Sequence, residues 1–223
     1  MSYLQTFIRN LFYWLPALII AMSFHEYAHG KAADMLGDPT PRYAGRLTLN
    51  PLRHVDPVGL LMLLIVKFGW AKPVHVNPLY FRGDRRRGML LVAVAGPGMN
   101  FLLAVLAGIA WALSYVARVK LGWEIAVHAV IFFEYLMLYN VYLGVFNLLP
   151  IPPLDGSKIL FNILPPRYSK FFYQIERYGF LILIVVLVTG LYQYFLTPVA
   201  NWIFTGIFTL AGLILRLFLG GAA

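Results

Sequence analysis

The sequence predicts an all-α integral membrane protein: a polytopic bundle of about five spanning helices, a re-entrant or interfacial segment and a few short strands. Of its 223 residues, 61% are hydrophobic and only 12% are charged, whereas soluble domains average about a quarter charged residues. The mean hydropathy is +0.73, and the 16% aromatic content suits membrane interfaces, where Trp and Tyr collect. Such a chain has too little polar surface to coat a water-soluble globule.

Charge and cysteine content narrow the function classes. The formal net charge is +9, but the basic residues lie mostly between apolar runs, which predicts a positive cytoplasmic face and contact with the lipid bilayer, and no nucleic-acid partner. The chain has no cysteine, which excludes a disulfide framework and a thiolate metal site. The first apolar run has no small-residue cleavage site, so we expect it to be retained.

Five apolar runs approach or exceed the roughly 20 residues that a helix needs to cross a bilayer. They are Leu11 to about Leu36, Met89 to about Val116, Ile125 to about Leu149, Gly179 to Leu196, and Val199 to Phe218. A sixth run, Val58 to Ala71, has only about 14 residues and contains Lys67, which is typical of a re-entrant or interfacial segment. The stretch "TPRYAGRLTLNP" before it predicts short strands. We expect one membrane-embedded domain over residues 1–223, with a core at 11–160 and additional C-terminal helices at 179–219.

The chemistry is concentrated in "SFHEYAHGKAA", residues 23–33. On a helix, His25 and His29 are four residues apart and share a face, so two imidazoles can hold one metal ion. Glu26 can act as a base toward a water on that metal, which is the H-E-x-x-H pattern of zinc hydrolases. Ionisable groups inside a membrane helix are expensive and usually functional, so the pattern indicates a metal site.

A catalytic zinc usually has three protein ligands, and the third is open at this point. The candidates are the Asp and Glu residues together with His54, His75 and His128. The stretch "NLLPIPPLDGSKI", from Asn147 to Ile159, contains three prolines that break helix and then Asp155. Taken alone, it is also compatible with an ordinary loop in which Asp155 caps the next helix.

Together, these motifs resemble the site-2 proteases, which are intramembrane zinc metalloproteases. "HEYAHG" and "NLLPIPPLDG" carry the resemblance, "AVAGPGMNFLLA" matches the family's Ala-Gly-Pro-x-x-Asn pattern, and "GRLTLNPLRHVDPVG" and "GWAKPVHVNP" are similar to its small bacterial members. The resemblance spans roughly residues 24–160. The chain departs from larger members in having no PDZ domain and no nucleotide-sensing domain.

The resemblance implies one Zn²⁺ per chain and a substrate that is a membrane protein with a transmembrane helix. It assigns the zinc ligands to His25, His29 and Asp155, and the catalytic carboxylate to Glu26. Asn147 is expected to contact substrate or to stabilise the oxyanion.

Two further residues are weaker candidates for substrate contact. Asn100 could also support the site or act as a helix-packing amide. His54 has a structural or interfacial role as its main alternative. No oligomeric state is predicted.

The membrane topology follows from the proposed ligand set. His25 lies on the first span and Asp155 follows the third, so the two spans must run parallel if both residues reach one ion. The run Val58–Ala71 therefore should not cross the membrane. Most of the 18 Lys and Arg residues then fall on the side nearer the metal, which predicts that the active site faces the cytoplasm of a prokaryotic cell membrane.

Two other function classes use the same polar residues. A catalytically inactive membrane scaffold is disfavoured by the intact Glu26 and by the complete set of proposed ligands. A metal or ion transporter is disfavoured because such proteins often carry paired repeats with broken helices in both halves, and this sequence shows no repeat. A zinc assay and a cleavage assay on purified protein would separate the three classes.

Overall fold

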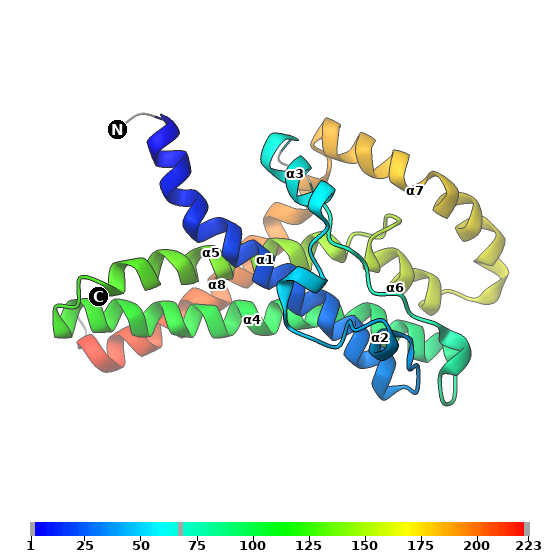
Figure 1. The fold of residues 1–223 in the computed structure, drawn as a ribbon, viewed down its shortest axis with the longest axis horizontal. Coiled ribbons are helices and arrows are strands. Elements are labelled where there is room, and N and C mark those ends of the chain that lie inside the picture. The colour runs from blue at the N-terminus through cyan, green and yellow to red at the C-terminus, as the bar shows by residue number, and fades with distance from the viewer. Residues whose placement is uncertain (1–2, 67–68, 221–223) are drawn as a thin grey trace.

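The structure is a computed structural model that describes residues 3–66 and 69–220 (Figure 1). Its elements are α1 (Tyr3–Met35), α2 (Thr40–Tyr43), η1 (Pro51–Arg53), α3 (Pro57–Val66), η2 (Pro78–Tyr80), α4 (Arg85–Leu121), α5 (Ala126–Asn147), α6 (Asp155–Ile163), η3 (Pro166–Tyr168), α7 (Ser169–Thr189) and α8 (Tyr192–Leu219). No strand occurs within the described ranges, so the predicted all-α class is confirmed.

The bundle is built on α4, which packs against α1, α5 and α8. Figure 1 shows α4, α5 and α8 side by side, with α1 crossing them. The buried core between these helices is rich in small side chains, among them Ala17, Ala104 and Ala200, each 0% exposed. Small residues let helix backbones approach closely where no hydrophobic effect drives association, as in a membrane.

Four of the described helices, α4, α5, α7 and α8, are long and apolar enough to cross a membrane. They cover four of the five predicted spans, and they fit an integral membrane protein. The first predicted span, Leu11 to about Leu36, lies in α1 except for its last residue. Helix α1 is 33 residues long and, by its length, exceeds a bilayer core of about 30 Å at about 1.5 Å per residue. The polar residues of its second half, including Glu26, Lys31 and Asp34, set α1 apart from the four apolar helices.

The boundary between the last two spans was predicted too late in the chain. The sequence suggested a break between Leu196 and Val199, next to Pro198. The structure places the break at Gly190, which ends α7 in the left-handed conformation with φ +73°, a backbone state that glycine adopts without steric cost. Pro198 lies inside α8, because membrane helices tolerate an interior proline better than soluble ones.

The short strands predicted for residues 40–51 are not present. This stretch forms the single turn of α2 and leads into η1, each with a proline among its first two residues. Proline presets φ near −65° for a helical turn and lacks the N–H that a strand ladder would need. The extended pairing in this region is one isolated bridge between Val55 and Ala71.

The two ends of the short apolar run, Val58 to Ala71, are held close together in space by pairing of the flanking chain. Its helix, α3, has ten residues, so it measures about 15 Å, half of a bilayer core. The bridge between Val55 and Ala71 joins the chain entering the segment to the chain leaving it, and the Lys72 N–H donates to the His54 carbonyl at 2.8 Å. Lys67, part of the predicted run, lies outside the described residues.

Candidate metal centre

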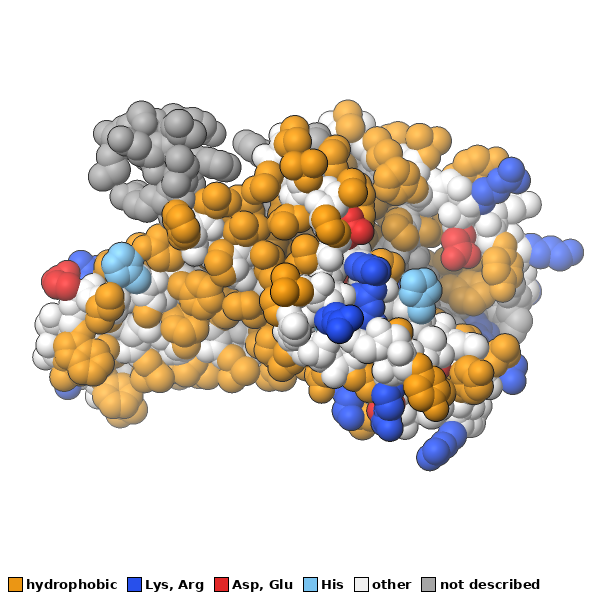
Figure 2. All heavy atoms as spheres, viewed as in Figure 1, with side chains coloured by type: hydrophobic (Ala, Val, Ile, Leu, Met, Phe, Trp, Pro, Cys, Tyr) orange, Lys and Arg blue, Asp and Glu red, His pale blue; other side chains and the backbone are white. Residues whose placement is uncertain are grey.

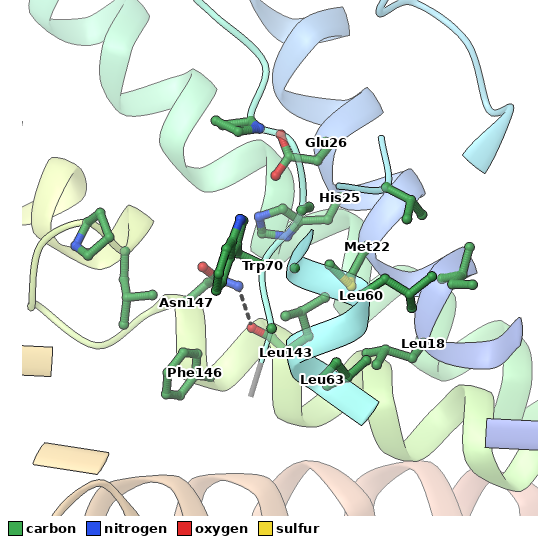
Figure 3. A pocket seen from close by; sticks show the side chains of 18 of the residues that line it. Leu18, Met22, His25, Glu26, Leu60, Leu63, Trp70, Leu143, Phe146 and Asn147 are labelled. Atoms are coloured by element: carbon green, nitrogen blue, oxygen red, sulfur yellow. Dashed lines mark hydrogen bonds between the residues drawn. The ribbon is translucent and has the colours of Figure 1, made fainter. Parts of the chain in front are cut away.

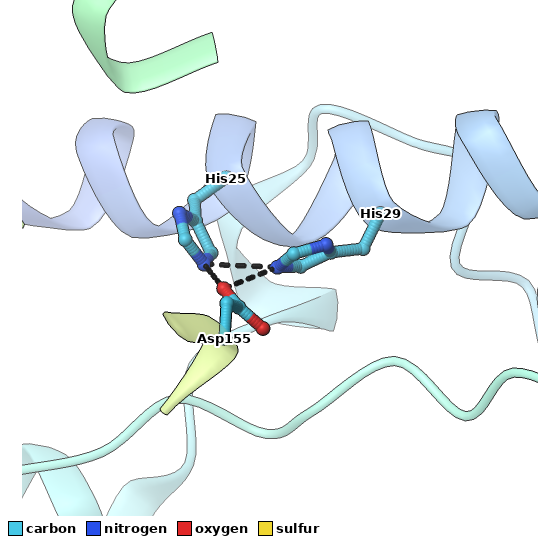
Figure 4. Close-up of side chains that lie close together, drawn as sticks. All are labelled: His25, His29 and Asp155. Atoms are coloured by element: carbon cyan, nitrogen blue, oxygen red, sulfur yellow. Dashed lines mark hydrogen bonds and ion pairs between the residues drawn. The ribbon is translucent and has the colours of Figure 1, made fainter. Parts of the chain in front are cut away.

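Two imidazoles on α1 and one carboxylate on α6 meet at a buried point (Figure 4). His25 Nε2 and His29 Nε2 lie 3.0 Å apart. Asp155 Oδ2 lies 3.1 Å from the first nitrogen and 3.0 Å from the second. All three side chains are buried, so the two histidines of the HExxH pattern face the interior of the bundle and the Asp of the later motif.

The chain bends sharply to bring Asp155 there. Helix α5 ends at Asn147, and α6 begins at Asp155 after a loop that contains Pro150, Pro152 and Pro153. Gly156 allows the first turn of α6 to lie against the end of α5, because a Cβ there would sit 2.2 Å from the Leu148 carbonyl oxygen. Gly156 does not adopt a positive φ, so the site needs its small size and not its backbone freedom.

The second nitrogen of each imidazole is held by α4. His29 Nδ1 lies 2.8 Å from the Val92 carbonyl oxygen, which can only accept, so Nδ1 carries the proton. His25 Nδ1 lies 2.6 Å from Asn100 Oδ1. Both Nε2 atoms are thereby left with lone pairs directed at Asp155, an arrangement typical of histidines that bind a metal.

Three electron-rich atoms converging in this way fit a zinc ion. Their separations of 3.0–3.1 Å put each atom about 1.8 Å from the common centre, so an ion slightly off their plane reaches all three at zinc bond lengths of about 2.0–2.2 Å. Without a cation, three lone pairs this close would repel each other in a buried setting. Two imidazoles and one carboxylate also form a usual donor set for catalytic zinc.

Gly96 on α4 is the wall behind the two imidazoles. A Cβ at this position would lie 2.4 Å from His29 Nε2 and 2.7 Å from His25 Cε1, closer than unbonded carbon and nitrogen atoms can approach. Gly96 belongs to the stretch "AVAGPGMNFLLA", and the structure gives its glycine a steric role at the metal centre. The sequence pattern contained this residue, but it could not show which atoms the glycine faces.

We expect Gly96→Ala to weaken zinc binding by about 10-fold to 100-fold, the range seen when an outer partner of a metal ligand is lost. The added methyl group must displace the imidazole nitrogen that faces the metal. Gly98→Ala is the matched control, because a Cβ at Gly98 meets nothing within 4 Å and both changes favour helix by about 0.5–1 kcal/mol. Zinc affinity measured by chelator competition checks the pair; equal affinities would remove Gly96 from the centre.

An apolar pocket of about 570 Å³ opens beside His25. Its walls come from α1, α3, α5, α7 and residues 69–73, and most of the lining is apolar, as with Met22 and Trp70. Glu26 and Asn147 add polar groups (Figure 3). Ligand pockets of roughly 300–1,000 Å³ with few polar groups are typical binding sites.

Glu26 and Asn147 are both held in place at this pocket. Glu26 Oε2 accepts a hydrogen bond from the Val74 N–H at 2.9 Å, so the extended chain after α3 fixes the carboxylate. Asn147 Nδ2 donates to the Leu143 carbonyl of its own helix at 3.0 Å. The amide oxygen of Asn147 is thus oriented away from that carbonyl, on a residue that lines the pocket.

The two weaker candidates lie elsewhere. Asn100 is 0% exposed and sits behind His25, so it contacts a proposed ligand and not the pocket. His54 is also 0% exposed, and its Nε2 lies 2.7 Å from the Thr48 carbonyl oxygen, which ties the loop before α3 together. Neither residue is among those that line the pocket.

The remaining histidines do not join the cluster. His75 is exposed. His128, near the start of α5, pairs with Tyr13 of α1, whose hydroxyl lies 2.5 Å from its Nδ1.

Two contacts that the sequence did not reveal hold the Asp155 loop and α6. Arg86, in the first turn of α4, donates to the carbonyls of Phe161 at 2.8 Å and of Leu164, so its guanidinium satisfies the free carbonyls at the end of α6. On α7, a Cβ at Gly179 would lie 2.4 Å from Pro152 Cβ. The helix therefore approaches the proline loop closely.

Residues 13–190 match the model of the family described as "Peptidase family M50". The chain belongs to peptidase family M50. It is 38% identical over 189 residues to "Putative zinc metalloprotease YwhC" of Bacillus subtilis (strain 168), covering 85% of this chain and 86% of that protein. It is 32% identical over 209 residues to "Putative zinc metalloprotease Rip2" of Mycolicibacterium smegmatis, covering 92% and 76% of the two chains. No solved structure matches.

Membership of this family confirms the resemblance to site-2 proteases that the motifs indicated. The chain is therefore a zinc metalloprotease, and its four long apolar helices fit an integral membrane protein. The predicted cofactor, Zn²⁺, is supported by the same comparisons and by the cluster of His25, His29 and Asp155.

Proposed function

We propose that this protein is an intramembrane protease that hydrolyses peptide bonds in or next to transmembrane segments of other membrane proteins. One observation carries the proposal: the cluster of His25, His29 and Asp155 adjoins an apolar pocket, through His25, that also contains Glu26 and Asn147. An apolar pocket suits residues that come from a membrane span. We propose further that residues 1–223 form a single membrane-embedded domain.

In this mechanism the three clustered side chains bind one zinc ion. When bound, zinc supplies Lewis-acid chemistry, polarising the peptide carbonyl and making a water molecule a stronger nucleophile at neutral pH. Glu26 accepts the proton of the attacking water and returns it to the leaving amine. Asn147, on the α5 side of the pocket, positions the substrate backbone or stabilises the oxyanion.

A substrate helix must lose part of its own hydrogen bonding before it can be cut, because its peptide groups are satisfied internally while it spans the bilayer. The walls of the pocket are mostly apolar and include Met22, Trp70 and Phe146, so they can contact the apolar side chains of an unwound substrate segment. We infer that residues flanking the cleaved bond are apolar.

The proposal places the metal centre toward the cytoplasm. Tyr13, in the first half of α1, pairs with His128, near the start of α5. His25, farther along α1, meets Asp155, which follows the end of α5, and this supports parallel first and third spans. The closed ends of the α3 segment support a segment that re-enters without crossing. Most of the Lys and Arg side chains visible in Figure 2 gather toward the right-hand end and lower edge, near α2, the start of α4 and the turn from α6 to α7, as on a cytoplasmic face.

Single cysteines test this topology, since the chain has none of its own. Trp123→Cys, between α4 and α5 and 57% exposed, should react from outside intact cells with an impermeant thiol reagent. Tyr43→Cys and Tyr80→Cys, at positions 84% and 56% exposed, should react only after permeabilisation. External labelling at 80 but not at 43 would show that the α3 segment crosses the membrane.

The proposed activity is tested by comparing the membrane proteins of cells that carry the natural chain with those of cells that carry Glu26→Gln. Substrates should accumulate at full length in the variant, and the purified protein should cut them within or next to a transmembrane segment. A zinc chelator should stop that cleavage and added zinc should restore it. Accumulated proteins that the purified enzyme leaves intact, or cleavage only in distant soluble domains, would contradict the proposal.

A further inference from the structure

A chain of buried amides connects the candidate metal centre to α5. His25 Nδ1 meets Asn100 Oδ1 at 2.6 Å. Asn100 Nδ2 donates to Asn140 Oδ1 at 2.9 Å, and Asn140 Nδ2 donates to the Leu136 carbonyl at 2.8 Å. Asn100 and Asn140 are both 0% exposed, so the chain runs from α1 through α4 to α5 without contact with solvent.

Each hydrogen bond in the chain fixes the direction of the next. The Leu136 carbonyl can only accept, so Asn140 turns its NH₂ toward it and its oxygen toward Asn100. The Asn140 oxygen and the Ala21 carbonyl oxygen, which lies 3.1 Å from Asn100 Nδ2, both accept hydrogen bonds. The NH₂ group of Asn100 must therefore face these two oxygens. The oxygen of Asn100 must therefore face His25, and His25 must carry its proton on Nδ1.

We propose that Asn140 is a positioning residue for the zinc centre: through Asn100 it sets the tautomer and ring orientation of His25. The inference rests on the proposed function only in taking His25 as a metal ligand. Asn140 touches neither the three clustered side chains nor the pocket. It acts at two hydrogen bonds' distance from the imidazole.

We call the hydrogen-bonded series from Asn140 through Asn100 to His25 the relay. The comparison with His29 explains why only one of the two imidazoles needs it. His29 Nδ1 is held by a backbone carbonyl, that of Val92, which has a single possible role. An asparagine amide can turn over and present either a donor or an acceptor. Asn100 therefore needs a second group to fix its orientation, and Asn140 supplies it from the same buried layer.

The test measures Zn²⁺ affinity by chelator competition on purified, detergent-solubilised protein. We expect Asn100→Leu to weaken binding by about 10-fold to 100-fold and Asn140→Leu by about 10-fold, since outer partners of metal ligands act in this range. Leucine has the same number and branching of side-chain heavy atoms as asparagine and excludes a replacement water. Asn140→Ala, which cannot clash, is measured as well, so that the test stands if the leucine variant does not fold.

A double-mutant cycle separates positioning from simple stabilisation. If Asn140 acts through Asn100, adding Asn140→Leu to Asn100→Leu should change zinc affinity by less than about twofold, because coupled sites are not additive. Val141→Ala is the matched control: Val141 is the next residue and is also 0% exposed, so its truncation should lower the melting temperature without changing zinc affinity.

The outcomes distinguish this inference from the proposed function. Suppose that His25→Ala loses zinc. The relay alone would then be overturned if folded Asn140 variants keep the natural zinc affinity. It would also be overturned if the losses of affinity caused by the two single asparagine changes multiply fully in the double variant. A His25→Ala protein that keeps its zinc would remove His25 from the metal centre and overturn both. The relay is supported by weakened zinc binding in Asn140→Leu that disappears in the Asn100→Leu background.

Discussion

Replacing Asp155 by alanine is expected to remove zinc from the folded protein and to reduce peptidase activity to background. Asp155 Oδ2 lies within 3.1 Å of both imidazole nitrogens and is the one carboxylate oxygen in the described cluster. The change leaves two nitrogen donors where catalytic zinc usually has three protein ligands. Zinc content by metal analysis should fall from about one ion per chain to near zero.

Loss of a helix cap is the competing explanation for any effect of Asp155→Ala. The N-cap of α6 is Leu154, and its side chain makes no capping hydrogen bond. By contrast, Asp84 caps α4 by accepting a hydrogen bond from the Arg87 N–H at 2.9 Å, and this N–H also lowers the pKa of Asp84. Asp84→Ala is therefore the control: it should destabilise the protein by about 0.5–2 kcal/mol and keep zinc. Unchanged zinc in folded Asp155→Ala would exclude Asp155 from the centre.

Glu26→Gln is expected to keep both zinc and fold while lowering the cleavage rate by about 10²-fold to 10⁴-fold, the usual contribution of a general base. The amide has nearly the same shape as the carboxylate, and its oxygen can still accept the hydrogen bond from Val74 N–H that holds Oε2 at 2.9 Å. It cannot take a proton from water. Single-turnover cleavage and zinc content, measured on one preparation, check the two halves of this prediction.

The control for Glu26→Gln is His29→Ala, and zinc content and cleavage activity are measured for both variants. His29→Ala should lose zinc and activity together, whereas Glu26→Gln should lose activity alone. A Gln variant that cuts within about tenfold of the natural rate would rule out Glu26 as the base, because such a small change is below the range of a lost general base.

The site could be anticipated from the sequence where local rules decide the geometry. The four-residue spacing of His25 and His29 on a helix places both imidazoles on one face, and the structure has them 3.0 Å apart. The prolines after Asn147 predict the end of a helix, and α5 ends there. Both features depend on a few neighbouring residues, which a single sequence displays in full.

The elements that were predicted wrongly depend on competition between local signals. Gly190 and Pro198 can each interrupt a helix, and the glycine prevails because it ends α7 in a left-handed turn while the bundle accommodates the proline inside α8. In residues 40–51, Thr, Tyr and Leu favour a strand, but the prolines direct the chain into helical turns. The outcome depends on packing partners that the sequence does not reveal.

Other features depend on contacts between distant segments. The sequence does not show that Gly96 contacts the metal centre. Its role becomes visible only in the structure, where the two imidazoles of α1 lie against it. Asn140 carries no motif, and its importance follows only from its hydrogen bond to Asn100, 40 residues away. The sequence left open whether Asn100 contacts substrate, supports the site or packs helices, and its position behind His25 makes it a partner of that imidazole.

The separation of His29 and Asp155 by 126 positions has a consequence for the order in which the protein is made. During translation, the two imidazoles are made first, as part of α1. Helix α4, which contacts them, is made next, and α5 follows. The acidic donor arrives only with α6, whose end Arg86 then secures. A nascent chain that stops before Asp155 carries no complete donor set. We therefore expect the protein to have no peptidase activity during its own insertion, and an interrupted translation product to be inert.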